Sequence, residues 1–209
     1  DIIDASVDIL FANNESFGRY APPAAPGPTI PGDPRNSVGA TSGYFRWTDI
    51  GTRDNVVNDD LINIDFGLTG DLSDEISWEV YATFSEYRSV SVGRSYLSYA
   101  GLEYNIAYDI QDFDTFVANL KATTLDDNKQ KMTKYFGGMQ WDLFEMGGGT
   151  AQTYWAMEYF EVDYAALVDA QSEAGLIGGS AGNSAQGYRD VTAFSAEAIF
   201  PVTDWLEID

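Results

Sequence analysis

The sequence contains neither cysteine nor histidine. The lack of cysteine excludes a disulfide framework and thiolate chemistry. The lack of histidine excludes a Ser-His-Asp triad, a histidine general base and a histidine-rich metal site. Basic residues are also scarce: 11 Lys and Arg stand against 33 Asp and Glu, which leaves a net charge of -22. Because a protein that binds a nucleic-acid backbone needs a basic surface, no nucleic-acid partner is expected. The acidity itself is compatible with a solvated surface or with a role in binding cations.

Long apolar runs are missing as well. No run of about 18 apolar residues occurs, so the sequence predicts no transmembrane helix. No secretory leader is present at Asp1, although an outer-membrane protein is made with one. The sequence begins inside a strand-like run, at residues 5–11, and stops at residues 205–209 as another strand begins. We therefore expect it to be a mature chain or a piece of a longer one.

What the sequence does contain is a series of segments in which apolar and polar residues alternate. From Ile76 to Phe84 every second residue is apolar, and Ser77, Glu79 and Thr83 lie between them. Side chains of a strand point alternately to its two faces, so such a segment predicts a strand with one apolar and one polar face. The pattern predicts about seven strands in all. They lie at about residues 4–12, 59–70, 75–88, 129–144, 150–163, 188–200 and 205–209, with a short strand extension at 43–49.

The connections between these strands alternate between short and long. Tight turns are expected at residues 71–74, 145–149 and 201–204, and long loops at 13–58, 89–128 and 164–187. Helical spacing inside two of the loops predicts short helices at 113–123 and 164–174. Compact soluble domains rarely have such loops, whereas transmembrane barrels combine short turns at one end with long loops at the other. The sequence therefore predicts an all-β fold, an antiparallel transmembrane β-barrel with long extracellular loops. Because a membrane barrel needs at least about eight strands, we expect a partial arc of a larger one.

The parity of each strand assigns its residues to one of two faces. Residues expected to face lipid are Trp78, Val80, Phe84, Met139, Trp141, Trp155 and Met157. Residues expected to face the lumen are Glu79, Gln140, Glu158 and Glu197. Aromatic residues near the strand ends are compatible with interfacial girdles; these are Trp78, Trp141, Phe144 and Trp205 near the turns and Phe84, Tyr87 and Tyr159 toward the loops. The same alternation and the same aromatics are also compatible with the core of a soluble β-sandwich.

No other pattern predicts a catalytic, metal or cofactor site. The acidic clusters at residues 58–60 and 126–128 could bind calcium but lack the spacing of an EF-hand, which favours solvated loop ends. The glycine runs at 147–149 and 178–182 are not followed by lysine, so turns are favoured over a phosphate cradle. Nothing in the spacing selects a carboxylate pair for glycoside hydrolysis. Loop aromatics could stack on sugars or aromatic chelators, or could pack the loops together; they are Tyr44, Trp47, Tyr96, Tyr99, Tyr104 and Tyr108.

Several stretches, taken in order, carry a family resemblance. They are LKATTLDDN at 120–128, FGGMQWDLFEMGGG at 136–149, WAMEYF at 155–160, QGYRDV at 186–191 and AEAIFPV at 196–202. Over about residues 59–209 the sequence resembles the barrel domain of TonB-dependent outer-membrane receptors, in particular those with large loops. The plug domain that precedes the barrel in that family, and the aromatic end of the barrel, are not in the sequence.

The resemblance implies a larger barrel of about 22 strands in the bacterial outer membrane. It also implies energy-coupled import of a scarce nutrient rather than an enzymatic reaction. The ligand classes of the family are ferric siderophores, cobalamin and carbohydrates. The implied partners are outer-membrane lipid, a small-molecule or oligosaccharide ligand, and the TonB energy-coupling complex, which acts through the plug. The lumen-facing residues would then form hydrogen bonds or ion pairs with the plug, or contact the ligand. A passive porin-like channel and a secreted all-β binding protein are the alternatives.

Overall fold

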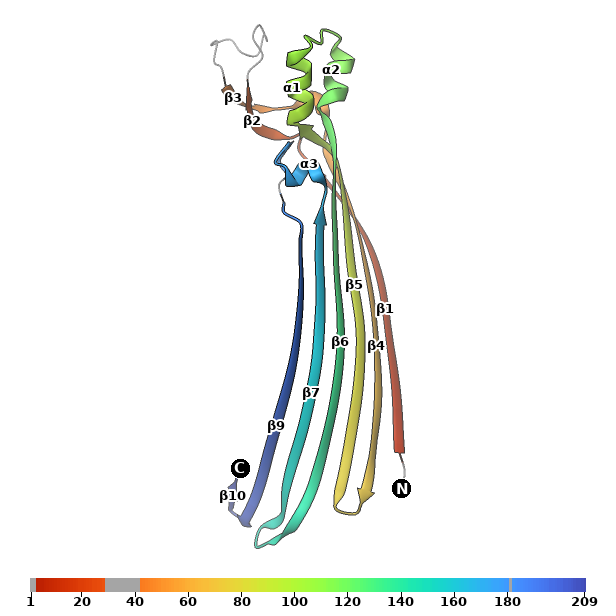
Figure 1. Cartoon of the computed structure of the whole chain (residues 1–209), viewed down its shortest axis with the longest axis vertical. Helices are drawn as coiled ribbons and strands as arrows, with labels where there is room; N and C mark the ends of the chain where they lie inside the picture. Colours follow the sequence, from red (N-terminus) through yellow and green to blue (C-terminus); the bar gives the residue numbers. More distant parts are fainter. Residues whose placement is uncertain (1–2, 29–41, 181) are drawn as a thin grey trace.

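Very long antiparallel strands dominate the computed structural model, which describes residues 3–28, 42–180 and 182–209 (Figure 1). The long strands are β1 (Ile3–Tyr20), β4 (Arg53–Ser73), β5 (Ile76–Ser98), β6 (Lys121–Met146), β7 (Gly149–Val168) and β9 (Ala185–Thr203). The shorter elements are β2 (Ala24–Pro28), β3 (Ser42–Arg46), the 3-10 helix η1 (Thr48–Ile50), α1 (Tyr99–Ala107), α2 (Phe113–Leu120), α3 (Ala170–Glu173), β8 (Ile177–Gly178) and β10 (Leu206–Ile208).

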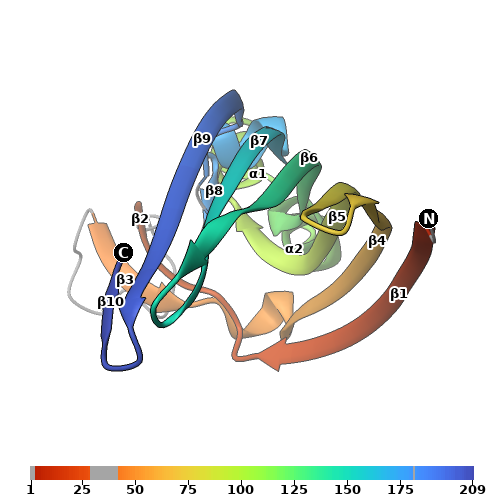
Figure 2. The ribbon, with the colours of Figure 1, turned by 90° about the horizontal axis from the view of Figure 1, so that it is seen from below.

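The long strands form one sheet in which neighbours in the sheet follow one another along the chain. The strand order is β1-β4-β5-β6-β7-β9-β10, every pairing is antiparallel, and β8 pairs with β5 near the far end of that strand. The sheet is twisted and curved but not closed, because β1 and β10 each pair on one side only within the described residues (Figure 2). β2 and β3 form a separate two-stranded sheet. The prediction of an all-β antiparallel arc is confirmed at this level.

Each of the three tight connections overlaps the range in which it was predicted, 71–74, 145–149 or 201–204, but is shorter than that range. Residues 74–75, 147–148 and 204–205 form two-residue turns, all at the end of the sheet opposite the helices (Figure 1). Glycine is required in the second turn, because a Cβ atom on Gly148 would collide with the backbone carbonyl of Thr203 in the neighbouring β9. The tight turns and the longer connections therefore lie at opposite ends of the sheet, as predicted.

The predicted loops are much shorter than expected because the strands continue into them. β1 extends to Tyr20, β4 begins at Arg53 and β6 begins at Lys121, so large parts of 13–58, 89–128 and 164–187 are strand. In these extensions polar residues lie on both faces, as at the consecutive residues Asn13 and Asn14 of β1, so the alternation that marks a strand is lost. The backbone pairing nevertheless continues without interruption along β1 and β4.

The helical predictions were correct in one case and wrong in another. The helix predicted at 113–123 is present as α2, and Asp112 caps it by accepting a hydrogen bond from the Thr115 amide at 2.8 Å. The helix predicted at 164–174 is wrong: residues 164–168 continue β7 by pairing with β6, and only the single turn α3 follows. α1 was not predicted.

A small apolar core holds the helical end together. Trp47, Ile50, Leu97, Leu102 and Leu120 are buried there, and Tyr99 and Phe116 pack against them. Away from this end, the described strands form a single layer without a second sheet packed on either face. No helix in the described part of the chain is both long and apolar enough to cross a membrane.

Candidate functional site

The hydrogen-bond register divides the sheet into two chemically different faces. Residues directly opposite one another on antiparallel strands have their side chains on the same face. Trp78 is opposite Met139, which is opposite Trp155, and Val80 is aligned in the same way with Met157. We call the face that carries these residues the apolar face. It carries all seven residues predicted to face lipid: Trp78, Val80, Phe84, Met139, Trp141, Trp155 and Met157.

The opposite face, here called the polar face, carries all four residues predicted to face a lumen. Gln140 and Glu197 are both directly opposite Tyr154. Glu79 is aligned through Gly138 with Ala156 of β7, and Glu158 is two residues from Ala156, so both glutamates are on the same face as Tyr154. Tyr87, which was expected in an aromatic girdle, is also on the polar face, where its hydroxyl donates to Asp59 at 3.0 Å. The period of two was sufficient to assign most of these residues because no bulge interrupts β5 between Ile76 and Gly93.

The apolar face carries a continuous band of hydrophobic residues next to the turns. Five successive positions on β1 belong to it (Ile3, Ala5, Val7, Ile9 and Phe11), and so do five on β5 (Ile76, Trp78, Val80, Ala82 and Phe84). Several side chains of the band are largely exposed, including Phe194 at 76 % and Trp155 at 57 %. Burial of apolar surface is the main driving force of folding, and an exposed apolar band is typical of a surface that contacts another protein, a ligand or a membrane.

The band ends toward the helices along an oblique line. The first charged or amide side chain on this face comes at the cross-strand pairs Asn13–Asp60 on β1 and β4, Glu86–Lys131 on β5 and β6, and Glu161–Asp190 on β7 and β9. Each pair lies two residues nearer the turns than the pair before it. Two residues are ~6.8 Å along a strand and two strands are ~9.6 Å across a sheet, so the boundary is inclined by ~35° to the line across the strands.

Polar contacts on the other face reach across neighbouring strands. The Tyr154 hydroxyl on β7 donates to Glu79 Oε1 on β5 at 2.6 Å. The Tyr154 side chain crosses β6 at Gly138 to reach Glu79, and a Cβ atom on Gly138 would collide with the tyrosine hydroxyl. Glu79, Gln140 and Tyr154 line one shallow cavity of this face. Tyr154 and Gly138 were not predicted as site residues, although the parity of Tyr154 relative to Trp155 identifies its face.

Glu158 belongs to a second cluster on the polar face. Lys134 Nζ forms an ion pair with Glu158 Oε2 at 2.5 Å, and Thr83 donates to Asp65 at 2.5 Å beside it. Asp65, Thr83, Lys134 and Glu158 line a common cavity together with Asp8. The structure therefore separates the four predicted residues into two groups rather than bringing them together at one site.

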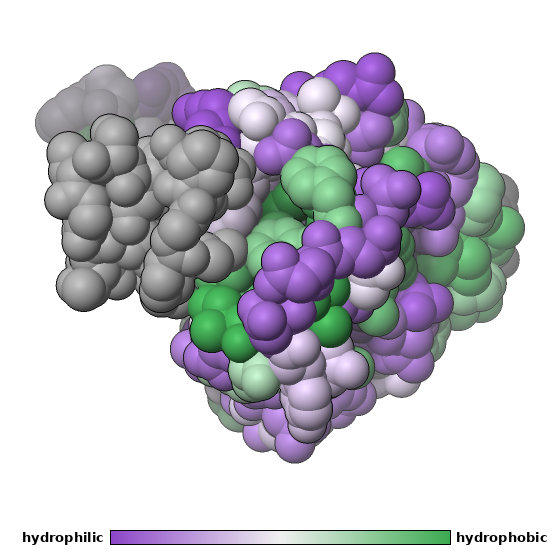
Figure 3. All heavy atoms as spheres, turned by 90° about the horizontal axis from the view of Figure 1, so that it is seen from above, coloured by the Kyte–Doolittle hydropathy of each residue, from purple (hydrophilic) through white to green (hydrophobic). Residues whose placement is uncertain are grey.

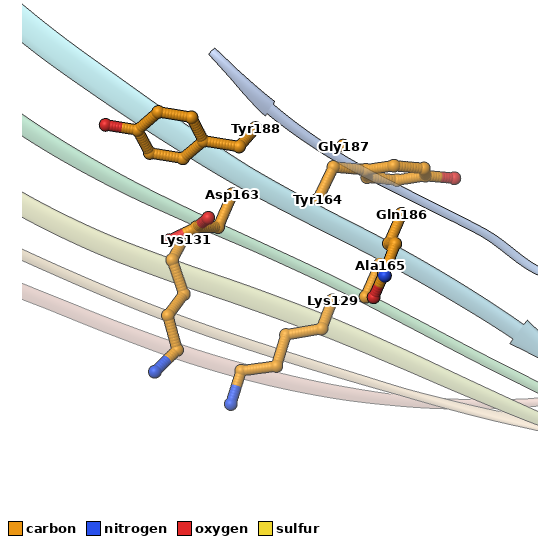
Figure 4. A pocket seen from close by; sticks show the side chains of 8 residues that line it. All are labelled: Lys129, Lys131, Asp163, Tyr164, Ala165, Gln186, Gly187 and Tyr188. Atoms are coloured by element: carbon orange, nitrogen blue, oxygen red, sulfur yellow. The ribbon is translucent and has the colours of Figure 1, made fainter. Parts of the chain in front are cut away.

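Basic side chains gather on the apolar face just beyond the band. Lys129 and Lys131 reach in the same direction from β6 (Figure 4). Both form ion pairs with Glu86 of β5, at 2.7 and 3.4 Å. Arg88 makes a bidentate pair with Asp127, at 2.9 and 2.6 Å. Each pair is at least partly exposed to solvent, with Asp127 the least exposed member at 24 %, so the pairs contribute little to stability. They mark the level at which the surface changes from apolar to charged.

The two acidic clusters considered as calcium sites lie in strands rather than at loop ends. Asp59 and Asp60 are neighbours in β4, so their side chains point to opposite faces, and the same holds for Asp126 and Asp127 in β6. Asp60 instead accepts a hydrogen bond from Asn13 at 2.7 Å. Across the residues that the structure describes, no three acidic side chains converge in a group that could hold a metal ion.

The loop aromatics have different surroundings. Trp47 and Tyr96 are buried and Tyr99 packs against the core, so these three pack the connections together. Tyr104 and Tyr108 remain exposed. The side chain of Tyr44 lies outside the described part of the structure.

Asp169 fastens the turn between β7 and α3. Its carboxylate accepts hydrogen bonds from the amides of Gln171 and Ser172, at 3.1 and 2.9 Å, and from the amide of Leu125 on β6 at 3.1 Å. Partial burial raises the pKa of Asp169, but these hydrogen bonds outweigh it and hold the pKa below the usual value.

Comparison with known proteins found no similar protein. No protein-family model, no curated protein and no solved structure matches the chain.

Proposed function

We propose that this chain is part of a TonB-dependent receptor, an arc of a large transmembrane β-barrel in the bacterial outer membrane that imports a scarce nutrient. In this proposal the apolar face contacts lipid and the polar face lines the lumen. The single observation that carries it is the oblique band on the apolar face. Strands of outer-membrane barrels are tilted by ~35–45° from the membrane normal, and the boundary of the band is inclined by ~35° to the line across the strands.

The height of the band supports the same interpretation. From Ile76 to Phe84 the band covers eight residue steps on β5, or ~27 Å along the strand. With the strand tilted by ~35°, this length corresponds to ~22 Å along the normal, close to the ~25 Å apolar belt of an outer-membrane barrel. Lys129, Lys131 and Glu86 then lie at the level of the lipid headgroups.

The length of the strands favours a receptor over a simple pore. A tilted strand crosses a bilayer in ~9–11 residues, whereas β5 has 23 and β6 has 26. Beyond Glu86, β5 continues for twelve residues to Ser98, ~40 Å past the band. Such strands would form a tall wall outside the membrane, capped by α1 and α2, where a ligand could be captured before transport. Energy coupling is inferred from the resemblance of residues 59–209 to TonB-dependent receptors, with the plug as the contact to the inner-membrane complex.

The lipid contact can be tested by placing single cysteines in a chain that has none. We expect a spin label at Val80, Met157 or Phe194 in the intact, membrane-inserted protein to be accessible to oxygen dissolved in lipid. A label at Glu79 or Glu158 should instead be accessible to a water-soluble nickel chelate. Equal aqueous accessibility at Val80 and Glu79 would overturn the membrane assignment.

The transport function needs a separate test in cells. Uptake of a candidate nutrient should depend on this protein and should stop when the TonB complex is deleted or the proton gradient is collapsed. Uptake that survives loss of the complex would support the porin-like channel instead. A soluble, cooperatively folding monomer would support the secreted binding protein.

A further inference from the structure

Two exposed tyrosine rings lie side by side at the end of the molecule that carries the helices. Tyr104 is in the last part of α1 and Tyr108 follows one turn later, and their ring centroids are 4.6 Å apart with planes inclined by 37°. The two residues are 51 % and 68 % exposed. Seen from this end, hydrophobic side chains show among a mainly hydrophilic surface (Figure 3). Trp47 and Tyr96, in the same part of the fold, are buried, so packing of the connections does not account for the tyrosine pair.

The scaffold beneath the pair is well anchored. Leu102, on the same helix, is buried in the apolar core. The buried side chain of Asn105 donates to the Phe116 carbonyl at 2.9 Å and accepts from the Asn119 side chain at 2.7 Å, which joins α1 to α2. The Asn105 carbonyl also accepts from the Ile110 amide at 3.0 Å, just after the tyrosines. The backbone that carries the two rings is therefore held in position before any ligand arrives, which lowers the entropic cost of binding.

The charged groups of this segment disfavour an anionic ligand. Residues 99–120 contain no basic residue and four carboxylates, at Glu103, Asp109, Asp112 and Asp114. Beside Tyr108, the Gln111 side chain donates a hydrogen bond to Asp109 Oδ1 at 2.6 Å. The carboxylate of Asp109 and the side-chain amide of Gln111 therefore lie next to each other on the exposed surface. Such a pair can bond to neighbouring hydroxyl groups of a neutral ligand.

We propose that Tyr104 and Tyr108 form a stacking surface for a neutral oligosaccharide, with Asp109 and Gln111 bonding to its hydroxyl groups. This inference rests on the proposed function, in which the helical end captures the ligand, and it assigns that ligand to the saccharide class. The C–H groups on the flat side of a sugar ring carry partial positive charge and suit the negative faces of the tyrosine rings. The rings touch one another, so they do not enclose the space that an ammonium group occupies in an aromatic cage.

The binding test uses the intact protein in detergent with maltohexaose, cellohexaose and xylohexaose as probes, measured by calorimetry. We expect at least one probe to bind, and Tyr104→Ala or Tyr108→Ala to weaken binding about 3- to 10-fold each. Phe113→Ala is the matched control, because Phe113 is 64 % exposed at the same end but lies outside the tyrosine pair. It should leave the affinity unchanged.

A second measurement needs no variant and so does not depend on the folding of one. Nitration of the unmodified protein, followed by mass spectrometry, should modify Tyr104 and Tyr108 readily, and the bound saccharide should protect both. Binding without protection, an equal loss in the Phe113 variant, or preference for the polycation spermine over every saccharide would overturn the inference. Energy-dependent import of a different ligand, with no saccharide bound, would also overturn it while leaving the proposed function intact.

Discussion

The cost of an arginine on the apolar face should depend on its depth in the proposed bilayer. Val80 is the third of five apolar positions on β5, so it lies ~11 Å from either end of the band once the tilt is included. Thr192 is on the same face of β9, at the position next to the charged Asp190 that marks the boundary. We expect Val80→Arg to destabilise the intact protein by ~2–4 kcal/mol and Thr192→Arg by ~0–1 kcal/mol.

Because the boundary of the band is oblique, two residues at the same level of the sheet should differ in the cost of an arginine. Ile9 on β1 and Phe84 on β5 are both aligned with Ile64 of β4. The boundary is two positions from Ile9, at Asn13, but only one position from Phe84, at Glu86. Measured along the normal, an arginine at Ile9 is therefore ~11 Å from the first charged or amide position on its strand and one at Phe84 only ~6 Å from it, so the cost should be larger at Ile9. Guanidinium titration of the protein refolded into vesicles measures each cost. Equal costs at Val80 and Thr192, or at Ile9 and Phe84, would refute the oblique band.

Three further predictions concern the polar face and the helical end. Replacing Gly138 with alanine should displace the Tyr154 hydroxyl from Glu79 and cost ~1 kcal/mol. The cost should be smaller in a Tyr154→Phe background, where the hydrogen bond is already absent and only the contact of the new Cβ atom with the ring Cζ remains. Leu102→Ala should destabilise the helical end by ~2–5 kcal/mol through the cavity it leaves, seen as faster proteolysis in α1 and α2 with β4–β7 still protected. The pKa of Asp169 is lower in the folded state, so its contribution should be complete above the unfolded value of ~3.9 and should be lost as the pH falls through the folded pKa. Hydrogen exchange of the residue 171–172 amides, normalised for its intrinsic pH dependence, should show this loss below ~pH 4, and an Asp169→Ala variant should not show it.

The sequence was sufficient to predict the faces of the sheet because burial and side-chain direction share a period of two. Residues such as Val80 and Glu79 could be assigned from parity alone. The length of the strands could not be predicted, because beyond Asn13 and Asp60 both faces meet water and the alternation disappears. There the backbone pairing set by the preceding residues continues the strand. The local pattern of apolar and polar residues therefore does not show where the strands end.

The helical end was harder to predict for a different reason. Residues 99–107 have apolar and polar residues mixed around the helix, so α1 lacks the stripe that identifies α2. The register of β6 against β7 pairs Val168 with Asp126, and this contact, distant in sequence, overrides the helical spacing at 164–168. Similarly, the tyrosine pair could be named from the sequence but not separated from the buried aromatics, because exposure depends on which loops pack together.

The order of the strands has a consequence for how the chain assembles. Each long strand pairs with the next long strand along the chain, and two of these pairings, β4–β5 and β6–β7, are closed by only two residues. A hairpin such as β4–β5 needs little loop-closure entropy, and each later hairpin can then dock on a partner that is already formed. If the strands add to the sheet in the order of the sequence, only one newly formed sheet edge is unpaired at each step. The rate of assembly should therefore depend on the turn at residues 74–75 more than on the length of the connections at the helical end.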